Sequence, residues 1–297
     1  MKPPYFSAHM ITNPTPFKDF IDRCLMEDAP EGDHSSVACI PDNAVGQARL
    51  LVKEKGILAG VAMAEMIFTH IHRDLALEIF MQDGSPIHPG DIVFSVRGNV
   101  RAILMAERLV LNCMQRMSGV ATLTAQYVKA LENTGCILLD TRKTTPGFRE
   151  MEKWAVRIGG GRNHRFGLSD MIMLKDNHID YAGGIEPAIL AVQKYLDQKN
   201  LPLKIEIEAR NLEEVKEILR VGKIDRIMLD NFNLSDLRTA VQMIGKSAET
   251  EASGGITLEN IREVALCGVN FISSGALTHA YKSLDLSLKA QMIPHLE

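Results

Sequence analysis

The sequence has few of the features that mark secreted, disulfide-rich or membrane proteins. Its 297 residues include five cysteines, an odd number with no Cys-x-x-Cys pair, which argues against a disulfide framework. No apolar run reaches the roughly 18 residues of a membrane span. The opening segment lacks the basic patch, apolar core and small-residue cleavage site of a signal peptide. These absences predict a soluble, cytoplasmic protein with reduced thiols and no membrane partner.

The chain also lacks an excess of positive charge. Lysine and arginine number 33 against 37 aspartate and glutamate residues, so the formal net charge is −4. A molecule with this net charge repels a polyanion, and we expect no nucleic-acid partner. An anionic ligand would have to be held by a local cluster of basic side chains.

The chain does have enough apolar material for two domains. With 46% hydrophobic residues it can bury a large core. Up to about Asn112, a predicted amphipathic helix over 17–26 precedes strand-like runs such as "DIVFSVRG", separated by turn signals, which favours an α+β domain. Residues 103–133 then predict two helices, with Gly119 as the interruption between them.

After Gly135 the same order of segments recurs along the sequence. Each time, a short apolar run is followed by a cluster of charged or glycine residues and then by a helical pattern. Strands that alternate with helices predict a parallel sheet, because a parallel connection needs a crossover. A complete eight-stranded barrel takes roughly 250 residues, so we expect a short, incomplete barrel here. The six apolar runs are "CILL", "MIML", "KIEI", "RIML", "ETEA" and "VNFI".

The residues just after these runs are predicted to share one rim, which is where the active sites of barrels lie. Cations on the rim suit carboxylates and phosphates, and two carboxylates suit a magnesium ion reached through waters. Small residues let backbone N–H groups approach a phosphate. The cationic candidates are Arg142, Lys143, His164, Arg165 and Lys175, the acidic ones are Glu208 and Asp230, and the small ones are Ser253–Gly255 and Ser274–Ala276.

Each of these classes also has a structural explanation. Either glycine loop alone could be a tight turn, although two of them on the last two strand ends match the phosphate site of barrels. The arginines could form structural ion pairs, and Glu208 and Asp230 could simply neutralise them. His164 could donate to a carboxylate or only orient Arg165, and His178 is interpreted as a loop-packing residue.

The rim chemistry predicts a ligand set of carboxylate, phosphate and a divalent metal, which points to phosphoribosyl transfer onto a carboxylated acceptor. The blocks that carry it are "LLDTRKTTPGFR", "GGGRNHRFGLSDMIMLKDNHI", "EIEARNLEEV", "IMLDNF", "EASGGI" and "ISSGALTH". These blocks resemble those of the quinolinate phosphoribosyltransferase family, and the resemblance reaches back to "EDAPEGDHSS" near the N-terminus. One departure is Ser35, where the family often has threonine.

The resemblance implies an α/β fold and a reaction. The expected fold is an N-terminal α/β sandwich domain over 1–115, an incomplete, open (α/β) TIM-like barrel over 116–275, and a C-terminal helical segment over 276–297 that packs back on the first domain. The implied reaction converts quinolinate and phosphoribosyl pyrophosphate to nicotinate mononucleotide, pyrophosphate and carbon dioxide, with Mg²⁺, in NAD biosynthesis. Family protomers pair, which implies a homodimer with composite active sites and leaves a higher oligomer open.

The resemblance also implies a role for each site residue. The catalytic candidates are Lys143, Glu208 and Asp230, and the two acids would serve the ribose and the magnesium ion, directly or through water. Arg108, in "MAERL", is expected to reach the partner's site. Quinolinate would be bound by Arg108, Arg142, His164, Arg165 and Lys175, and phosphate by Ser253, Gly254, Gly255, Ser274 and Gly275.

Three alternatives remain open from the sequence. A paralogous phosphoribosyltransferase would keep the phosphate machinery and use another acceptor. A barrel lyase would form a Schiff base on Lys175, which ends a predicted strand. A non-catalytic phosphate-binding protein would not need both Glu208 and Asp230.

Overall fold

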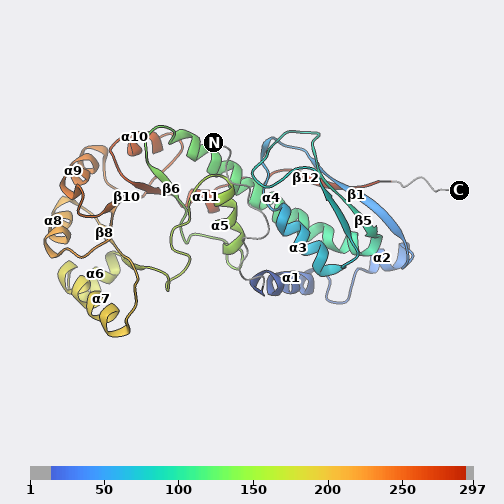
Figure 1. Cartoon of the computed structure of the whole chain (residues 1–297), viewed down its shortest axis with the longest axis horizontal. Helices are drawn as coiled ribbons and strands as arrows, with labels where there is room; N and C mark the ends of the chain where they lie inside the picture. The colour runs from blue at the N-terminus through green and yellow to red at the C-terminus, as the bar shows by residue number, and fades with distance from the viewer. Residues whose placement is uncertain (1–14, 292–297) are drawn as a thin grey trace. The chain divides into compact units, whose positions relative to one another are not determined.

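Residues 15–291 are described by a computed structural model, in which they form two units (Figure 1). Of the described residues, the first unit contains 15–123, the segment Thr145–Gly159 and 281–291; the second contains Thr124–Thr144 and Gly160–Ala280. The predicted boundaries at 115/116 and 275/276 divide the chain differently. In particular, helix α5 (Arg149–Ile158) belongs to the first unit, although it lies between two barrel strands in the sequence.

The first unit is built on an antiparallel sheet with the strand order β12-β1-β5-β3. Its strands are β1 (Val45–Val52), β3 (Ala76–Ile79), β5 (Ile92–Asn99) and β12 (Leu286–Gln291), and the short strands β2 (Gly56–Ile57) and β4 (Pro86–Ile87) pair separately. Burial alternates along β1, as expected for a sheet with one face on a core.

The C-terminal part of the chain corrects one prediction. Residues 276–297 were expected to be helical, but only α11 (Ala276–His279) is a helix and residues 286–291 form β12, which pairs with β1. The alternation of Leu286 and Leu288 with polar residues is a strand pattern, because both leucines are buried. Residues 292–297 lie outside the described part of the chain.

Helices α1 (Thr15–Asp28), α2 (His34–Cys39) and α3 (Val61–Ile71), most of α4 (Val100–Ala130), and α5 complete the first unit. The helix predicted over 17–26 is therefore confirmed. The two helices predicted over 103–133 are one, because α4 continues through Gly119. A Cβ atom at that position would lie 2.3 Å from the carbonyl oxygen of Lys282, so the glycine permits close packing rather than a break.

The second unit contains six parallel strands in the order β6-β11-β10-β9-β8-β7. All six predicted apolar runs are confirmed as strands, and within the described residues the edge strands β6 and β7 do not pair with each other, so the barrel is open. This confirms the predicted fold class. The strands are β6 (Ile137–Leu139), β7 (Ile172–Leu174), β8 (Ile205–Ala209), β9 (Arg226–Asp230), β10 (Glu249–Ser253) and β11 (Phe271–Ser273).

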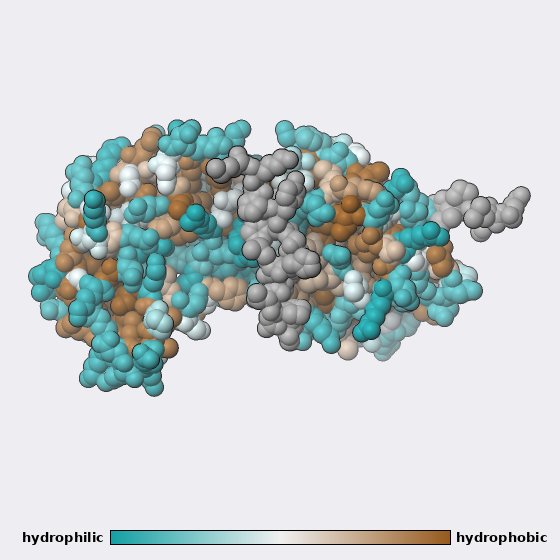
Figure 2. Space-filling view, viewed as in Figure 1, coloured by the Kyte–Doolittle hydropathy of each residue, from teal (hydrophilic) through white to brown (hydrophobic). Residues whose placement is uncertain are grey.

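Helices connect these strands and lie along the outer side of the sheet in Figure 1. None of the described helices is long and apolar enough to cross a membrane. Figure 2 shows hydrophilic and hydrophobic residues interspersed over the visible face of both units. The connecting helices are α6 (Asp176–Ala182), α7 (Ile185–Lys199), α8 (Leu212–Val221), α9 (Leu234–Ile244) and α10 (Ile261–Ala265).

Candidate active site

A pocket of about 660 Å³ lies at the carboxyl ends of the six parallel strands, within the second unit. Its volume is in the range of small-molecule sites, roughly 300–1,000 Å³. The structure brings together most of the predicted rim residues in its lining: Arg142, Lys143, His164, Arg165, Lys175, Glu208, Asp230, Ser253, Gly254 and Gly255. Ser274 and Gly275 are not among the lining residues, and Arg108 lies exposed on α4 in the first unit.

Strand alternation explains why charged side chains surround this pocket. Successive side chains of a strand point to opposite faces, so the "IEIEA" sequence of β8 places Glu206 and Glu208 on one face and Ile205 and Ile207 on the other. The parallel register then puts Asp230 of β9 beside Ser253 of β10. The inner face of the barrel therefore has ionisable residues where a parallel sheet is usually apolar throughout.

Two guanidinium groups line the pocket, on Arg142 and Arg165. The Nε atom of Arg142 is buried and has no hydrogen-bond partner among the described residues. Burial lowers the pKa of Arg165, and the positive charge of Arg142 lowers it further. Arg165 also donates from Nη1 to the carbonyl of Met171 at 3.2 Å, which orients its side chain. The guanidiniums of Arg142 and Arg165 repel each other, and Nε of Arg142 still has a hydrogen to donate. Two such groups in one pocket form a binding site for an anion.

An acidic pair lines the same pocket. Glu208 is buried, and it forms an ion pair with Lys175 and accepts from the main-chain N–H of Asp176 at 3.4 Å. Asp230 accepts from Nδ2 of Asn231 at 2.7 Å. Carboxylate oxygens are the ligands that Mg²⁺ prefers, and this ion usually keeps waters and takes only one or two protein carboxylates beside substrate phosphates. The donor set therefore fits a magnesium ion.

The loop Ser253–Gly255 has the shape of a backbone cradle. Gly254 has φ +87°, and a Cβ there would lie 2.2 Å from Oδ1 of Asn231, so only glycine fits. Gly255 has φ +61° and faces open space. Helix α10 begins only at Ile261, so no helix N-terminus directly follows this loop.

The second small-residue loop, Ser274–Ala276, makes room for the side chain of Lys143 and does not itself line the pocket. A Cβ on Gly275 would lie 2.8 Å from Cδ of Lys143, so the glycine makes room for the lysine stem. Thr278 donates from Oγ1 to the Lys143 carbonyl at 2.9 Å, and the Lys143 N–H donates to Oγ1 of Thr141 at 3.0 Å. These bonds fix the Lys143 backbone and leave its exposed side chain at the pocket.

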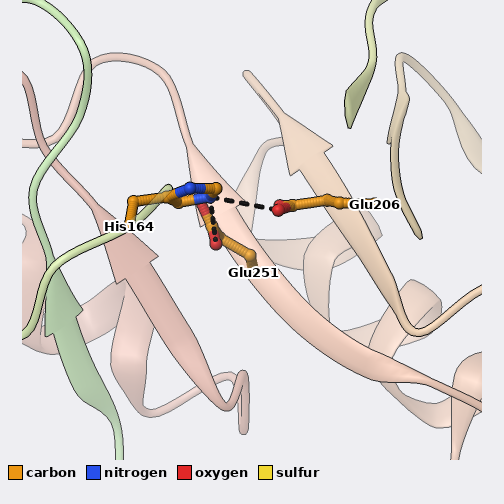
Figure 3. Close-up of side chains that lie close together, drawn as sticks. All are labelled: His164, Glu206 and Glu251. Atoms are coloured by element: carbon orange, nitrogen blue, oxygen red, sulfur yellow. Dashed lines mark ion pairs between the residues drawn. The ribbon is translucent and has the colours of Figure 1, made fainter. Parts of the chain in front are cut away.

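His164 lines the pocket, but both of its ring nitrogens have protein neighbours, and Figure 3 shows the two glutamates beside one of them. Nε2 lies 3.0 Å from Glu206 Oε2 and 3.3 Å from Glu251 Oε2. Nδ1 accepts from the main-chain N–H of Arg165 at 2.7 Å, so Nε2 carries the ring proton in the neutral imidazole. Burial lowers the pKa of His164 and the two carboxylates raise it, while burial and the charge of Glu251 raise the pKa of Glu206 to about 7. The bond that Nδ1 accepts from Arg165 requires an unprotonated Nδ1, so the proton that this cluster binds is placed between Nε2 and the carboxylates.

His178, interpreted from the sequence as a loop-packing residue, has a local structural role. Its Nδ1 accepts from the main-chain N–H of Lys175 at 3.0 Å, at the start of α6. This bond fixes the turn that presents Lys175 to the pocket.

Several lining residues and the buried acids behind them were not predicted from the sequence. Glu206 and Glu251 could have been found from the ionisable residues that recur at every second position of β8 and β10. Asn231 directly follows Asp230 and adopts φ +57°, which no sequence pattern signals. The lining residues that were missed are Thr141, Met173, Asp176, Met228, Asn231 and Ser273.

Two family models match this chain. The model of the quinolinate phosphoribosyl transferase N-terminal domain matches residues 33–118, and that of the C-terminal domain matches residues 120–289. The chain belongs to the quinolinate phosphoribosyltransferase family. The family resemblance deduced from the sequence is therefore confirmed, and with it the assignment of the chain as a phosphoribosyltransferase enzyme.

Individual family members are similar over almost the whole chain. The chloroplastic nicotinate-nucleotide pyrophosphorylase (carboxylating) of Arabidopsis thaliana is 50% identical over 287 residues, which cover 92% of this chain and 82% of that protein. A probable nicotinate-nucleotide pyrophosphorylase (carboxylating) of Synechocystis is 38% identical and covers 94% of this chain and 97% of its own length. The crystal structure of NadC from Streptococcus pyogenes superposes with a TM-score of 0.89 at 37% identity, covering 95% and 98% of the two chains.

Proposed function

We propose that this chain transfers the phosphoribosyl group of phosphoribosyl pyrophosphate to quinolinate and removes one carboxylate, giving nicotinate mononucleotide, pyrophosphate and carbon dioxide. The observation that carries the proposal is the pairing of two guanidiniums, Arg142 and Arg165, with a glycine cradle in a single pocket. The first group suits a dicarboxylate and the second suits a phosphate. Relatives of this chain are named for this activity.

The proposed mechanism begins with the positioning of the acceptor. Arg142, Arg165 and Lys175 hold the two quinolinate carboxylates, so that the pyridine nitrogen faces the ribose. The bond between ribose C1′ and the pyrophosphate oxygen breaks, and its electron pair leaves with pyrophosphate. The cationic rim, including Lys143, stabilises this developing negative charge. The ring nitrogen then donates its lone pair to C1′.

Decarboxylation follows ribosyl transfer in this mechanism. Once the ring nitrogen is quaternary, the bond from ring carbon 2 to its carboxylate breaks and carbon dioxide leaves. The electron pair stays on the ring carbon, where the adjacent positive nitrogen stabilises it, and the carbon then takes up a proton. The enzyme contributes by holding quinolinate in a fixed position relative to the ribose while the positive charge forms on the ring nitrogen.

Magnesium is part of the proposal, with Glu208 and Asp230 as the residues that would hold it, directly or through water. When bound, the ion would neutralise pyrophosphate charge. Glu208 has a second task, because its ion pair with Lys175 fixes that lysine at the quinolinate side of the pocket. Glu208 would thereby link the two substrate sites.

The Schiff-base alternative is disfavoured by the surroundings of Lys175. A lysine nucleophile must be desolvated or placed beside another cation. The Lys175 side chain is 44% exposed and is paired with the carboxylate of Glu208. Treatment with borohydride and a keto substrate should therefore leave no covalent adduct, and a trapped adduct on Lys175 would favour the lyase.

The deciding experiment compares two acceptors. The full chain is incubated with phosphoribosyl pyrophosphate, magnesium and either quinolinate or nicotinate, and nicotinate mononucleotide is measured. Quinolinate should be used well, and nicotinate should be a very poor substrate, since it lacks the 2-carboxylate and leaves part of the cationic set unpaired. Comparable turnover of the two acceptors, or turnover of neither, would contradict the proposal and favour a paralogue with another acceptor.

We also propose a homodimer in which Arg108 completes the partner's site. Arg108 is exposed on α4, one turn after Leu104, which is itself 40% exposed. Arg108→Ala and Lys143→Ala homodimers should both be inactive. In a hybrid dimer of these two chains, one site collects both lesions and the other none, so activity should return towards half that of the unmodified dimer. A hybrid isolated with two tags that stays as inactive as its parents would rule out the shared site.

A cytoplasmic location remains our proposal from the sequence. Relatives from Arabidopsis thaliana and Nicotiana glauca are named chloroplastic and mitochondrial, respectively. Fractionation of the source cells with an antibody to this chain should find it with cytoplasmic markers. Recovery in an organelle fraction would overturn the prediction.

A further inference from the structure

Three buried side chains from different segments meet behind the pocket. His164 follows β6 in the chain, Glu206 lies on β8 and Glu251 on β10, and Figure 3 shows both carboxylates pointing at the same edge of the imidazole ring. Glu206 and Glu251 are fully buried, and the His164 side chain is 4% exposed. His164 lines the pocket, whereas the two glutamates do not. The two carboxylates therefore do not contact a ligand in the pocket directly, and His164 stands between them and the pocket.

A cation on the neighbouring strand compensates the two buried carboxylates. Nη1 of Arg226 lies 2.9 Å from Glu251 Oε2 and 4.0 Å from Glu206 Oε2, and the Arg226 guanidinium stacks 3.9 Å from the ring centre of Phe271. Burying carboxylates costs several kcal/mol each before pairing, and apolar residues of similar size would avoid that cost. A role in fixing the site gives a reason for this arrangement.

The connection from the carboxylates to the pocket passes through His164. One edge of the ring faces the two glutamates, and Nδ1 on the other edge accepts from the main-chain N–H of Arg165. The main-chain N–H of His164 donates to Oδ1 of Asp140 at 2.8 Å. Ring and backbone are thereby fixed together, immediately before the arginine whose guanidinium lines the pocket.

We propose that Glu206 and Glu251 are positioning residues, which lock the His164 ring and through it set the placement of Arg165 for binding a dicarboxylate acceptor. We infer this on the basis of the proposed use of quinolinate. The same three side chains have atom types that could bind a metal ion, and they lie within 4.8 Å of one another. The guanidinium of Arg226 already supplies the positive charge there, so the assignment is to positioning.

The test measures binding of each substrate separately to the full chain by calorimetry. Glu206→Gln and Glu251→Gln should each raise the dissociation constant of quinolinate about tenfold or more, by analogy with the outer hydrogen-bond partners of metal-ligating histidines. The dissociation constant of phosphoribosyl pyrophosphate with magnesium should change less than about twofold, a split that general destabilisation would not produce. The matched control is Glu249→Gln, because Glu249 lies on the same strand and bonds Arg226 at 3.1 Å but does not contact His164.

A double-mutant cycle tests the route through His164. In a His164→Gln background, Glu251→Gln should weaken quinolinate binding by less than about twofold more. If the glutamine variants do not fold, Glu206→Asp and Glu251→Asp replace them. The shorter side chains keep a negative charge beside Arg226 but move the carboxylate away from His164. The dissociation constants of quinolinate and phosphoribosyl pyrophosphate are then compared in the same way. Equal weakening of both substrates, no weakening, or an equal effect in Glu249→Gln would overturn the proposal.

A measurement without substrate separates this proposal from the proposed function. In Glu251→Gln, the ¹⁵N signals of the His164 ring should shift in NMR spectra of the free protein, and in Glu249→Gln they should not. If the unmodified protein does not use quinolinate, the proposed function fails while this arm still reports on the network. The positioning role is contradicted if the His164 signals do not shift in Glu251→Gln. It is also contradicted if the purified protein contains a stoichiometric divalent ion that is lost in Glu251→Gln.

Discussion

The two sheets of this molecule use their inner faces in different ways. In the antiparallel sheet of the first unit, Leu50 of β1 and Phe94 of β5 are fully buried, and Phe94 packs edge-on against Phe68 of α3 at 5.9 Å. In the parallel sheet of the second unit, Glu206 and Glu251 are equally buried. The first sheet is held by apolar contacts, whereas the second uses its interior for charge.

The difference separates a sheet face that stabilises the fold from a sheet face that carries charged groups next to the pocket. Burial of an apolar side chain stabilises a fold directly, while a buried carboxylate is tolerated only when a cation or donor faces it. The charged strands β8, β9 and β10 are neighbours, and their ionisable side chains compensate one another across the sheet. A charged inner face in a parallel sheet is therefore a signal of an active site.

The largest expected effect is on the stability of the first unit. Phe94→Ala removes a fully buried aromatic ring and its contact with Phe68, and should lower the free energy of unfolding by about 3–5 kcal/mol. The kcat/KM of the remaining folded protein should change less than about threefold. Denaturant titration and assays of the folded fraction give both quantities. Phe80→Ala, at a ring that is 50% exposed, is the control and should have little effect.

The reverse pattern is expected in the pocket. Arg142→Ala removes a guanidinium from the anion site and should lower kcat/KM for quinolinate about 100-fold, with the melting temperature unchanged or higher, since Arg142 and Arg165 repel each other. Arg238→Ala, at an exposed arginine of α9 outside the pocket, is the control. A large loss of stability with normal activity would erase the distinction between the two sheets.

Much of this organisation could be predicted from the sequence. All six barrel strands were found, because each apolar run ends in a turn or charged cluster, and the pocket lining follows from the common direction of parallel strand ends. The carboxyl-terminal strand β12 was missed because its partner, β1, lies over 230 residues earlier in the chain, and local pattern cannot show such a pairing. The buried glutamates were missed because their cations lie on other segments, and only the fold brings them together.

A smaller effect should separate the two substrate sites within the pocket. Glu208→Gln and Asp230→Asn should raise the KM for phosphoribosyl pyrophosphate about tenfold and increase the magnesium concentration needed for half-maximal rate. Glu208→Gln should also weaken quinolinate binding, since it releases Lys175, whereas Asp230→Asn should not. Initial rates over a grid of both substrates and magnesium resolve the two effects. Normal magnesium dependence in both variants would show that these acids do not serve the metal.

The smallest expected effect concerns a carboxylate of the first unit that serves a helix instead of a ligand. Asp83 accepts from the main-chain N–H of Val61 at 2.8 Å, at the start of α3, where the N-cap residue Gly60 has no side chain to do so. Burial raises the pKa of Asp83 to about 6, although the hydrogen bonds from the helix N–H groups oppose the rise. A raised carboxyl pKa means that the folded state binds the proton more tightly than the unfolded state, whose value is about 3.9.

The stability that this proton contributes is fully present below the unfolded pKa and is lost as the pH rises through about 6. Asp83→Asn removes the titration but keeps an oxygen that can accept from Val61. Between pH 4 and pH 7, the free energy of unfolding of the variant should therefore gain about 1–2 kcal/mol relative to the unmodified chain, since one pKa unit corresponds to about 1.4 kcal/mol and the side chain keeps some contact with water. Denaturant titrations at several pH values measure this difference. For Asp74→Asn, at an exposed position, the difference in the free energy of unfolding from the unmodified chain should not change with pH. The Asp83 variant and the unmodified chain should have the same kcat/KM at every pH. That result would show that a shifted pKa alone does not mark an active site in this molecule. An altered pH profile of activity would instead tie this helix cap to the chemistry of the barrel.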